Sequence, residues 1–229
     1  MPSTLPHITL DTSPNPQHSI IWLHGLGADG EDFVPLAHEI KLPVAVRYIF
    51  PHAPMQAVTI NNGYVMRAWY DIYAPAANAE FSAGLTWHQD EKGIRASQLE
   101  IEKLIVQEKQ RGIAAENIYL AGFSQGGAVI LHTGLRHTER LGGILALSAY
   151  LPLAEKLSYE ASNVAQQVPI FMAHGHSDPI VPYQLGTLSR DKMRHAGCTV
   201  EWHEYHMPHS LCDAEVLDIE NWLSRMLQS

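Results

Sequence analysis

Short, continuous hydrophobic runs alternate along this chain with longer stretches in which hydrophobic residues recur every three or four positions. Runs of the first kind are typical of strands buried on both faces of a parallel sheet, and stretches of the second kind are typical of helices that cover such a sheet. The predicted strands cover residues 19–24, 44–50, 117–121, 143–149, 168–174 and 199–205. The predicted helices cover residues 32–40, 89–111, 184–195 and 213–227, and a further helix begins at residue 127.

The longest helical stretch, residues 89–111, shows the division between faces most clearly. Ile94 and Ile101 fall on one face, and charged residues occupy the other. Gly112 follows the last periodic residue, where glycine commonly ends a helix. Repeated strand–helix units imply a doubly wound, mostly parallel sheet with helices on both faces. A chain of 229 residues fits one such α/β domain, so we expect a single domain over residues 1–229.

Residues 51–88 interrupt this alternation. The segment is long and largely aperiodic, and it is rich in proline, glycine, asparagine and aromatic residues. A loop of this length in a compact domain is usually functional or disordered. Because aromatic side chains bring large areas to bury, we favour an ordered segment that forms a lid or wall over a pocket. The segment can also hold a short β-hairpin, and a purely structural excursion packed on the sheet edge is the alternative interpretation.

The pentapeptide Gly122–Phe123–Ser124–Gln125–Gly126 lies between a predicted strand and a predicted helix. It matches G-x-S-x-G, in which a sharp strand-to-helix turn presents the serine hydroxyl above a parallel sheet. The two glycines suit this turn, because a side chain at either position would crowd the approaching strand and helix. The pattern by itself also fits a glycine-rich helix start with an ordinary serine. Its place between strand and helix favours Ser124 as a nucleophile.

A serine hydroxyl needs a base to remove its proton, and in this kind of fold the acid and the histidine follow the serine along the chain. Open α/β sheets bind their ligands at the carboxyl ends of the strands. Asp178 lies just after the strand predicted at residues 168–174, and His209 lies between the strand at 199–205 and the last helix. Ser124, Asp178 and His209 therefore form the predicted catalytic triad.

Other residues compete for two of these roles. The chain contains 14 histidines, of which His203 and His206 are the nearest competitors of His209. His203 falls within a predicted strand, and His206 lies closer to the strand end than His209 does. Asp191 falls within a predicted helix, and Asp213 stands where an acidic residue favours a helix N-terminus. Asp178 and His209, which lie in the two loops, are preferred on these grounds.

The negative charge that builds on a substrate carbonyl oxygen during attack needs hydrogen-bond donors. The backbone N–H of Gln125, directly after the serine, is the expected first donor. The glycine-rich residues 24–30 follow the first predicted strand, and their backbone can approach a substrate closely, so the N–H of Leu26 is the expected second donor. Such a loop can also hold phosphate, but neither the phosphate-loop pattern nor the dinucleotide-binding glycine pattern is present.

Composition and charge restrict the function classes. The net charge of −9 argues against nucleic acid and against an electrostatic grip on anionic lipid. No run approaches the 18 consecutive apolar residues of a membrane-spanning helix, so we expect no stable membrane insertion. The first residues lack the basic start and apolar core of a secretory signal, and Cys198 and Cys212 are too few for a disulfide framework. A reduced, cytoplasmic setting is the expectation.

The segments HGLGADGED, GFSQGG, SAYLPL, HGHSDPIVP and MPHS together resemble the phospholipase/carboxylesterase family of small α/β-hydrolases, which includes carboxylesterases and acyl-protein thioesterases. The resemblance extends over nearly the whole chain and implies the α/β-hydrolase fold. It places the family's nucleophile, acid and base on Ser124, Asp178 and His209. It also places the oxyanion donors on Leu26 and Gln125.

The resemblance further identifies Trp69 and Tyr70, followed by Asp71, as the family's Trp-aromatic-Asp element in the loop that shapes the acyl pocket and binds substrate. The chain departs from the family pattern at Ala149, where many relatives carry cysteine, and residues 73–85 follow no family pattern. These departures bear on the preferred acyl chain and leave the chemistry unchanged.

The predicted activity is hydrolysis of esters or thioesters with medium-to-long acyl or aryl groups through an acyl-Ser124 intermediate, without a metal or an organic cofactor. Lysophospholipase activity is the alternative within the family. The H-x-H-x-D pattern from His174 to Asp178 would suit a metal-dependent hydrolase, although Pro179 stands where the binuclear motif has another histidine. A non-catalytic binding protein is the remaining alternative. The expected partner is a small-molecule ester or acylated substrate, and exposed apolar loop surface is compatible with a homodimer.

Overall fold

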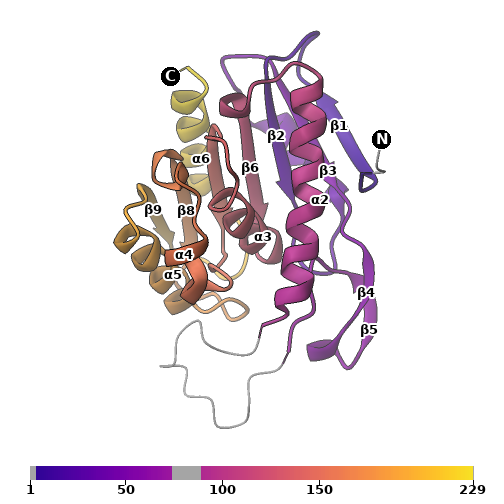
Figure 1. Ribbon diagram of the computed structural model, residues 1–229, viewed down its shortest axis with the longest axis vertical. Coiled ribbons are helices and arrows are strands. Elements are labelled where there is room, and N and C mark those ends of the chain that lie inside the picture. Colours follow the sequence, from indigo (N-terminus) through magenta and orange to yellow (C-terminus); the bar gives the residue numbers. More distant parts are fainter. Residues whose placement is uncertain (1–3, 74–88, 229) are drawn as a thin grey trace.

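A seven-stranded sheet runs through the middle of the protein (Figure 1). The computed structural model describes residues 4–73 and 89–228. Strand order is β1-β3-β2-β6-β7-β8-β9; β1 pairs antiparallel with β3, and every other pair in this sheet is parallel. The strands are β1 (His7–Asp11), β2 (His18–Leu23), β3 (Val46–Pro51), β6 (Ile118–Phe123), β7 (Gly143–Leu147), β8 (Ile170–Gly175) and β9 (Val200–Tyr205).

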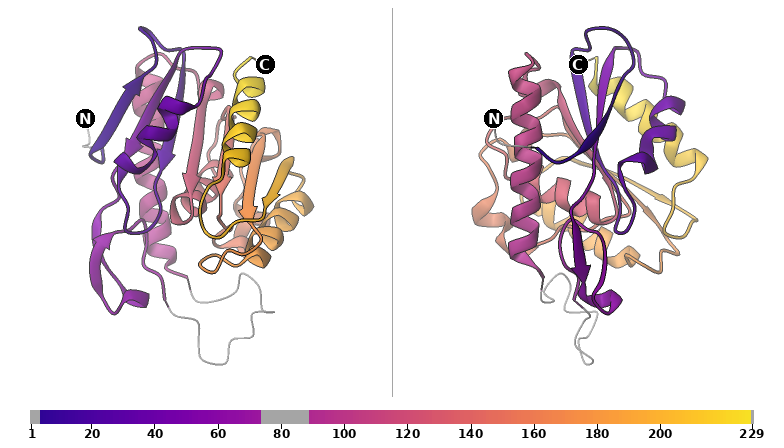
Figure 2. Two further views of the ribbon diagram at one scale, coloured as in Figure 1. Left: turned by 180° about the vertical axis from the view of Figure 1, so that it is seen from behind. Right: turned by 90° about the vertical axis from the view of Figure 1, so that its right-hand side faces the viewer.

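Helices cover both faces of the sheet (Figure 2). The α-helices are α1 (Val34–Glu39), α2 (Glu91–Gln110), α3 (Gln125–Gly134), α4 (Leu157–Glu160), α5 (Tyr183–His195) and α6 (Asp213–Met226). One buried cluster joins the sheet to α2, α3 and α5 through residues such as Ile101, Val129 and Leu185. A second cluster joins the opposite face to α1 and α6 through residues such as Ala37 and Trp222. The predicted doubly wound, mostly parallel sheet is therefore confirmed.

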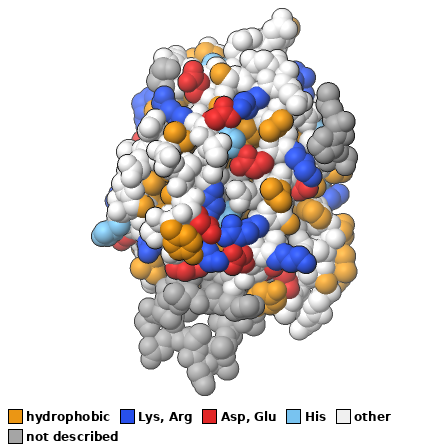
Figure 3. Space-filling model, viewed as in Figure 1, with side chains coloured by type: hydrophobic (Ala, Val, Ile, Leu, Met, Phe, Trp, Pro, Cys, Tyr) orange, Lys and Arg blue, Asp and Glu red, His pale blue; other side chains and the backbone are white. Residues whose placement is uncertain are grey.

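The outer face of α2 is mixed, since Leu99 and Val106 are exposed beside the charged side chains that the sequence predicted there. Acidic and basic side chains are interspersed over this side of the molecule (Figure 3). Glu91, at the start of α2, forms ion pairs with Arg95 and Lys156, and Arg95 also pairs with Glu160 of α4. Within the described ranges, no helix is both long and apolar enough to cross a membrane.

Two parts of the chain differ from the sequence-based expectation. The edge strand β1 was not predicted, because its five residues are short, half exposed and preceded by proline, so they carry little periodic signal. The helix expected at residues 32–40 begins earlier, as a 3-10 turn over Gly30–Phe33 that leads into α1. The side chain of Asp29 accepts a hydrogen bond from the N–H of Glu31 and caps this turn.

Residues 51–88 contain the β-hairpin that their composition allowed. β4 (Met55–Val58) pairs antiparallel with β5 (Tyr64–Arg67), and a 3-10 turn over Thr59–Asn61 lies between them. Asn62 and Gly63 close the hairpin with φ of 56° and 75°, a conformation that asparagine and glycine tolerate best. Residues 74–88, which complete the predicted lid, lie outside the described residues.

Glu215, in the first turn of α6, is an ionisable group in the interior of the protein. Its side chain is fully buried. Burial, with a smaller contribution from the charge of Asp218, raises the pKa of Glu215 to about 8. In an unfolded chain the same carboxyl has its ordinary pKa of 4.5. The folded protein therefore holds this proton more tightly than the unfolded chain does.

This difference makes stability depend on pH. Because the folded state binds more protons between about pH 4.5 and pH 8, the free energy of unfolding should fall as the pH rises through this interval. We expect Glu215→Gln, which mimics the protonated carboxyl, to remove roughly 3–5 kcal/mol of this fall. Urea denaturation at several pH values measures the free energy of unfolding of each protein. The exposed Glu116→Gln is the control, and a constant difference between native protein and Glu215→Gln across the interval would contradict the prediction.

Candidate active site

Ser124 lies on the turn between β6 and α3, at the carboxyl end of the central strands. Its backbone has φ of 55° and ψ of −120°, a conformation that is strained for any residue other than glycine. The N–H of Ser124 donates to the carbonyl of Leu147 at 2.8 Å, which ties the turn to the end of β7. Only 8% of Ser124 is exposed. The structure thus holds Ser124 on a sharp strand-to-helix turn, as G-x-S-x-G predicted.

The glycines on either side of Ser124 are required by close backbone contacts. A Cβ at Gly126 would lie 2.5 Å from the carbonyl oxygen of Leu23 and 2.6 Å from that of His24. A Cβ at Gly122 would lie 2.6 Å from the carbonyl carbon of Gly126. Such distances do not occur between real atoms, so β2, β6 and α3 can approach this closely only with glycine at both positions.

Asp178 and His209 meet beside this turn, although they come from different loops. Asp178 lies between β8 and α5, and His209 lies between β9 and α6. The Nδ1 atom of His209 donates to Oδ2 of Asp178 at 2.6 Å. Oδ1 of Asp178 accepts from the backbone N–H groups of Ile180 and Val181 at 2.8 and 2.9 Å. Burial alone would raise the pKa of Asp178, but these three donors outweigh it and hold the pKa below its ordinary value.

His209 packs against the residue that precedes the serine. Its ring centroid lies 4.6 Å from that of Phe123. Within the described part of the chain no hydrogen bond joins Ser124 to His209. Hydrogen bonds between catalytic groups are often long before substrate binds and shorten in the complex.

The competing residues lie elsewhere. His203 stacks on Phe171 within the sheet, with ring centroids 4.7 Å apart, and the exposed His206 stacks on His176. Asp191 pairs with Arg190 on α5, and Asp213 is the first residue of α6. Asp178 and His209 therefore form the acid–histidine pair that lies beside the serine turn.

The two predicted oxyanion donors lie on either side of the serine turn. Leu26 belongs to the loop after β2, and Gln125 is the first residue of α3. Among the described residues, neither backbone N–H donates a hydrogen bond to another part of the protein. The neighbouring Gly27 is anchored differently, since its N–H donates to the carbonyl of Arg67 on β5 at 2.8 Å. Both N–H groups are thus available to a bound oxygen atom.

Comparison with known proteins agrees with this geometry. The family model described as Phospholipase/Carboxylesterase matches residues 7–227. Acyl-protein thioesterase 1 of Neurospora crassa is 40% identical over 215 residues, which are 91% of this chain and 86% of the relative. The corresponding protein of Yarrowia lipolytica is 37% identical and covers 92% of each chain.

The chain belongs to the phospholipase/carboxylesterase family. It is accordingly a serine hydrolase with the α/β-hydrolase fold. The crystal structure of Arabidopsis thaliana SOBER1 superposes on it with a TM-score of 0.84 at 31% identity, covering 92% of this chain and 99% of that one. The Zea mays acyl-protein thioesterase 2 structure gives a TM-score of 0.79 at 25% identity and covers 96% and 99% of the two chains.

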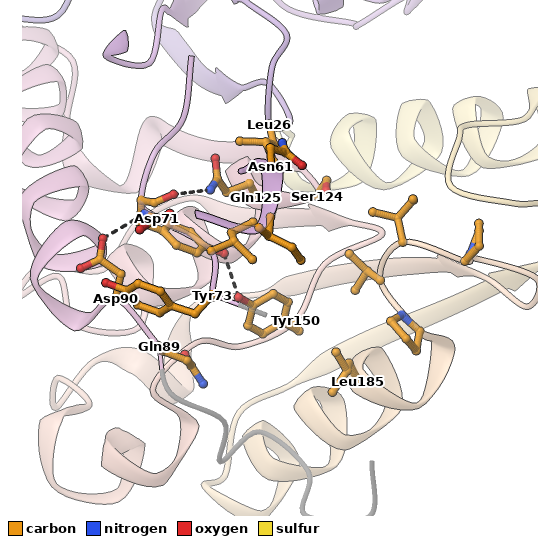
Figure 4. Close-up of a pocket in the computed structure, with 17 residues that line it drawn as sticks. Leu26, Asn61, Asp71, Tyr73, Gln89, Asp90, Ser124, Gln125, Tyr150 and Leu185 are labelled. Atoms are coloured by element: carbon orange, nitrogen blue, oxygen red, sulfur yellow. Dashed lines mark hydrogen bonds between the residues drawn. The ribbon is translucent and has the colours of Figure 1, made fainter. Parts of the chain in front are cut away.

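In this family member, Ser124 opens into a cavity of about 540 Å³ (Figure 4). This volume lies within the range of small-molecule sites. The loop after β8 contributes apolar lining, and the segments after β5 and before α2 contribute the two acidic groups, Asp71 and Asp90. The described lining residues are Leu26, Ile60, Asn61, Tyr70, Asp71, Ile72, Tyr73, Gln89, Asp90, Ser124, Gln125, Tyr150, Pro179, Ile180, Val181, Pro182 and Leu185.

Tyr70 and Trp69, the two predicted substrate-binding residues, face different surroundings. Tyr70 lines the cavity, and its hydroxyl shares a hydrogen bond of 2.9 Å with that of Tyr150. Trp69 is only 2% exposed and is not among the described lining residues of this cavity. Lining residues that the sequence did not predict include Tyr150, Ile180 and Val181, although each lies within a few residues of a strand end, where α/β folds bind ligands.

The backbone strain at Ser124 yields a prediction about stability. Ser124→Gly relieves the positive φ of 55°, whereas Ser124→Ala retains it. We expect the glycine variant to be more stable than the alanine variant by about 1 kcal/mol, although both lack the hydroxyl. Urea denaturation gives the difference. The same comparison at Ala96, inside α2, should have the opposite sign, since Ala96→Gly costs about 1 kcal/mol in a helix. Equal stability of the two Ser124 variants would contradict the prediction.

Proposed function

We propose that the protein hydrolyses carboxylic esters and thioesters of medium-to-long acyl or aryl groups through an acyl-Ser124 intermediate. Nε2 of His209 takes the hydroxyl proton as Oγ of Ser124 attacks the carbonyl carbon. Asp178 holds the imidazole by its Nδ1–H and stabilises the imidazolium that forms. The alcohol or thiol leaves with the proton from His209. A water molecule, deprotonated by the same histidine, then releases the acid.

The N–H groups of Leu26 and Gln125 are proposed to stabilise the oxyanion in both steps. Donors of this kind contribute about 3 kcal/mol each in hydrolases from which one can be removed. The observation that carries the proposal is the juxtaposition at Ser124. A strained serine and two unengaged N–H groups lie at one cavity, and an acid–histidine pair joined at 2.6 Å packs on Phe123, the residue before that serine.

The lining of the cavity supports uncharged acyl groups as substrates. Ile72, Ile180 and Leu185 provide apolar surface, and the described lining contains no lysine or arginine. Asp71 and Asp90 are the charged groups of the described lining, and in Figure 4 they lie on the opposite side from Leu185. An acyl chain that ends in a negative charge would lose its hydration and gain no cation. The names of the acyl-protein thioesterase relatives agree with an acyl substrate.

The role of Ser124 is tested by its removal. We expect Ser124→Ala to lower turnover of a p-nitrophenyl ester by about 10⁴- to 10⁶-fold while the protein stays folded. A fluorophosphonate probe should label the native protein on Ser124 and should not label the variant. Ser158→Ala, which changes an exposed serine of α4, is the control and should keep both properties. Substantial hydrolysis or labelling in Ser124→Ala would remove Ser124 from the proposed role.

The charge preference is tested with three p-nitrophenyl esters of matched length, made from hexanoic acid, 6-aminohexanoic acid and adipic acid. We expect kcat/KM to be highest for the neutral ester and lowest for the anionic one. Desolvation opposes both charges, whereas Asp71 and Asp90 repel only the anion. An anionic ester that reacts as fast as the cationic ester would contradict this assignment. A palmitoyl thioester and a lysophospholipid, added to the panel, separate thioesterase from lysophospholipase activity.

A further inference from the structure

Trp69 makes a hydrogen bond with every polar group that it has. Its indole Nε1–H donates to the carbonyl of His24 at 2.9 Å, and its backbone N–H donates to Oε1 of Gln125 at 2.8 Å. Its carbonyl accepts from the hydroxyl of Ser97 on α2. The side chain is 2% exposed, so these bonds are shielded from water. One residue therefore connects the loop after β2, the start of α3 and helix α2.

The bond to His24 fixes the loop that carries Leu26. The backbone N–H of Ala53 donates to Nε2 of His24 at 3.1 Å, so this nitrogen accepts and the proton is on Nδ1. Nδ1–H in turn donates to the carbonyl of Gly25 at 2.7 Å. Burial lowers the pKa of His24 to about 4, which keeps the ring neutral and its Nε2 able to accept. The carbonyls of residues 24 and 25 are thus both held, directly before the N–H of Leu26.

The bond to Gln125 fixes the second donor. The Gln125 side chain accepts from the N–H of Trp69 and donates through Nε2 to the carbonyl of Tyr70 at 2.8 Å. These two bonds bind the first residue of α3 to the segment that follows β5. The N–H of Gln125 itself stays unengaged among the described residues. The side chain of Gln125 therefore positions its own backbone against the same tryptophan that holds the loop of Leu26.

We propose that Trp69 is a positioning residue of the oxyanion hole. It sets the distance between the N–H groups of Leu26 and Gln125. This inference rests on the proposed function, because it needs an oxyanion between the two donors. It assigns Trp69 a place behind the site, in contact with backbone and not with the acyl chain. A displacement of well under 1 Å at either donor weakens stabilisation of the transition state without altering the cavity that binds the substrate.

Trp69→Phe removes the indole donor and keeps an aromatic ring and the backbone N–H. We expect kcat/KM for the hexanoate ester to fall by about 10- to 100-fold, less than the full loss of a donor. A trifluoromethyl ketone, whose adduct with Ser124 places an oxyanion between the two N–H groups, should bind more weakly by a similar factor. Binding of 1-hexanol, which has no carbonyl or carboxylate and forms no such oxyanion, should change by less than about twofold.

Trp22→Phe is the matched control. Trp22 is 1% exposed, and its indole nitrogen makes no hydrogen bond within the described residues, so the same substitution removes buried volume without removing a bond. We expect the affinity of the ketone to be unchanged in this variant. Loss of ketone affinity in both variants would assign the effect to packing and overturn the proposal. Unchanged ketone affinity in a folded Trp69→Phe would overturn it as well.

Gln125→Met gives the same test from the other side, including the case in which Trp69→Phe does not fold. It keeps the side-chain volume and the backbone N–H of residue 125 but loses both bonds to residues 69 and 70. The affinity for the ketone and kcat/KM should again fall together. A ketone affinity equal to that of the native protein would contradict the inference. A native protein that the ketone does not inhibit would instead contradict the acyl-Ser124 mechanism. The two failures are therefore distinguishable.

Discussion

The close approach of three backbone segments at the β6–α3 turn is the constraint on which the rest of the site depends. The backbone of α3 begins so near the carbonyl oxygens at the end of β2 that Gly126 cannot carry a Cβ. A Cβ at Gly122 would likewise collide with the backbone of the following turn, and a Cβ at Gly127 would collide with the side chain of Ala149. This packing forces the positive φ of Ser124, which would relax in a looser turn. The buried clusters on the two faces of the sheet supply the contacts that hold this turn in place.

The parallel sheet then brings the remaining groups to the same edge. β2, β6, β8 and β9 run in one direction, so the loops after them lie at one end of the sheet. Each loop is also fixed by specific bonds. Asp178 is held by two backbone N–H groups in the first turn of its own loop, and the N–H of Gly27 is held by β5. The site is therefore made of loops that have little freedom to move independently of the sheet.

The difference between local patterns and contacts made by residues far apart in the chain explains how much the sequence could predict. The strand–helix alternation and the local turn chemistry around Ser124 are encoded within a few residues, so the fold class, the serine turn and the chain order of Asp178 and His209 followed from pattern alone. The orientation of Trp69 is set by partners 28 to 56 positions away, which no local periodicity reports. β1 is an edge strand whose pairing with β3 fixes it more than its composition does. Residues 51–88 were predicted to form a lid or wall over a pocket. Tyr70 and Ile72 line the cavity, but their positions depend on the course of the chain after the hairpin, which no local pattern predicts.

The protonation states of Asp178 and His24 follow from burial acting together with the hydrogen bonds that each group makes. The Asp178 carboxylate accepts three hydrogen bonds, which keep its pKa low and the group ionised. Burial lowers the pKa of His24 against the bond that Nδ1–H donates to Gly25, and the neutral ring accepts the N–H of Ala53 at Nε2. Protonation of His24 at Nε2 would break its bond from the N–H of Ala53, and protonation of Asp178 is opposed by the three donors that its carboxylate receives. In the proposed mechanism this leaves His209, whose ring is bonded to Asp178 only through Nδ1, as the group that moves the proton to and from Ser124.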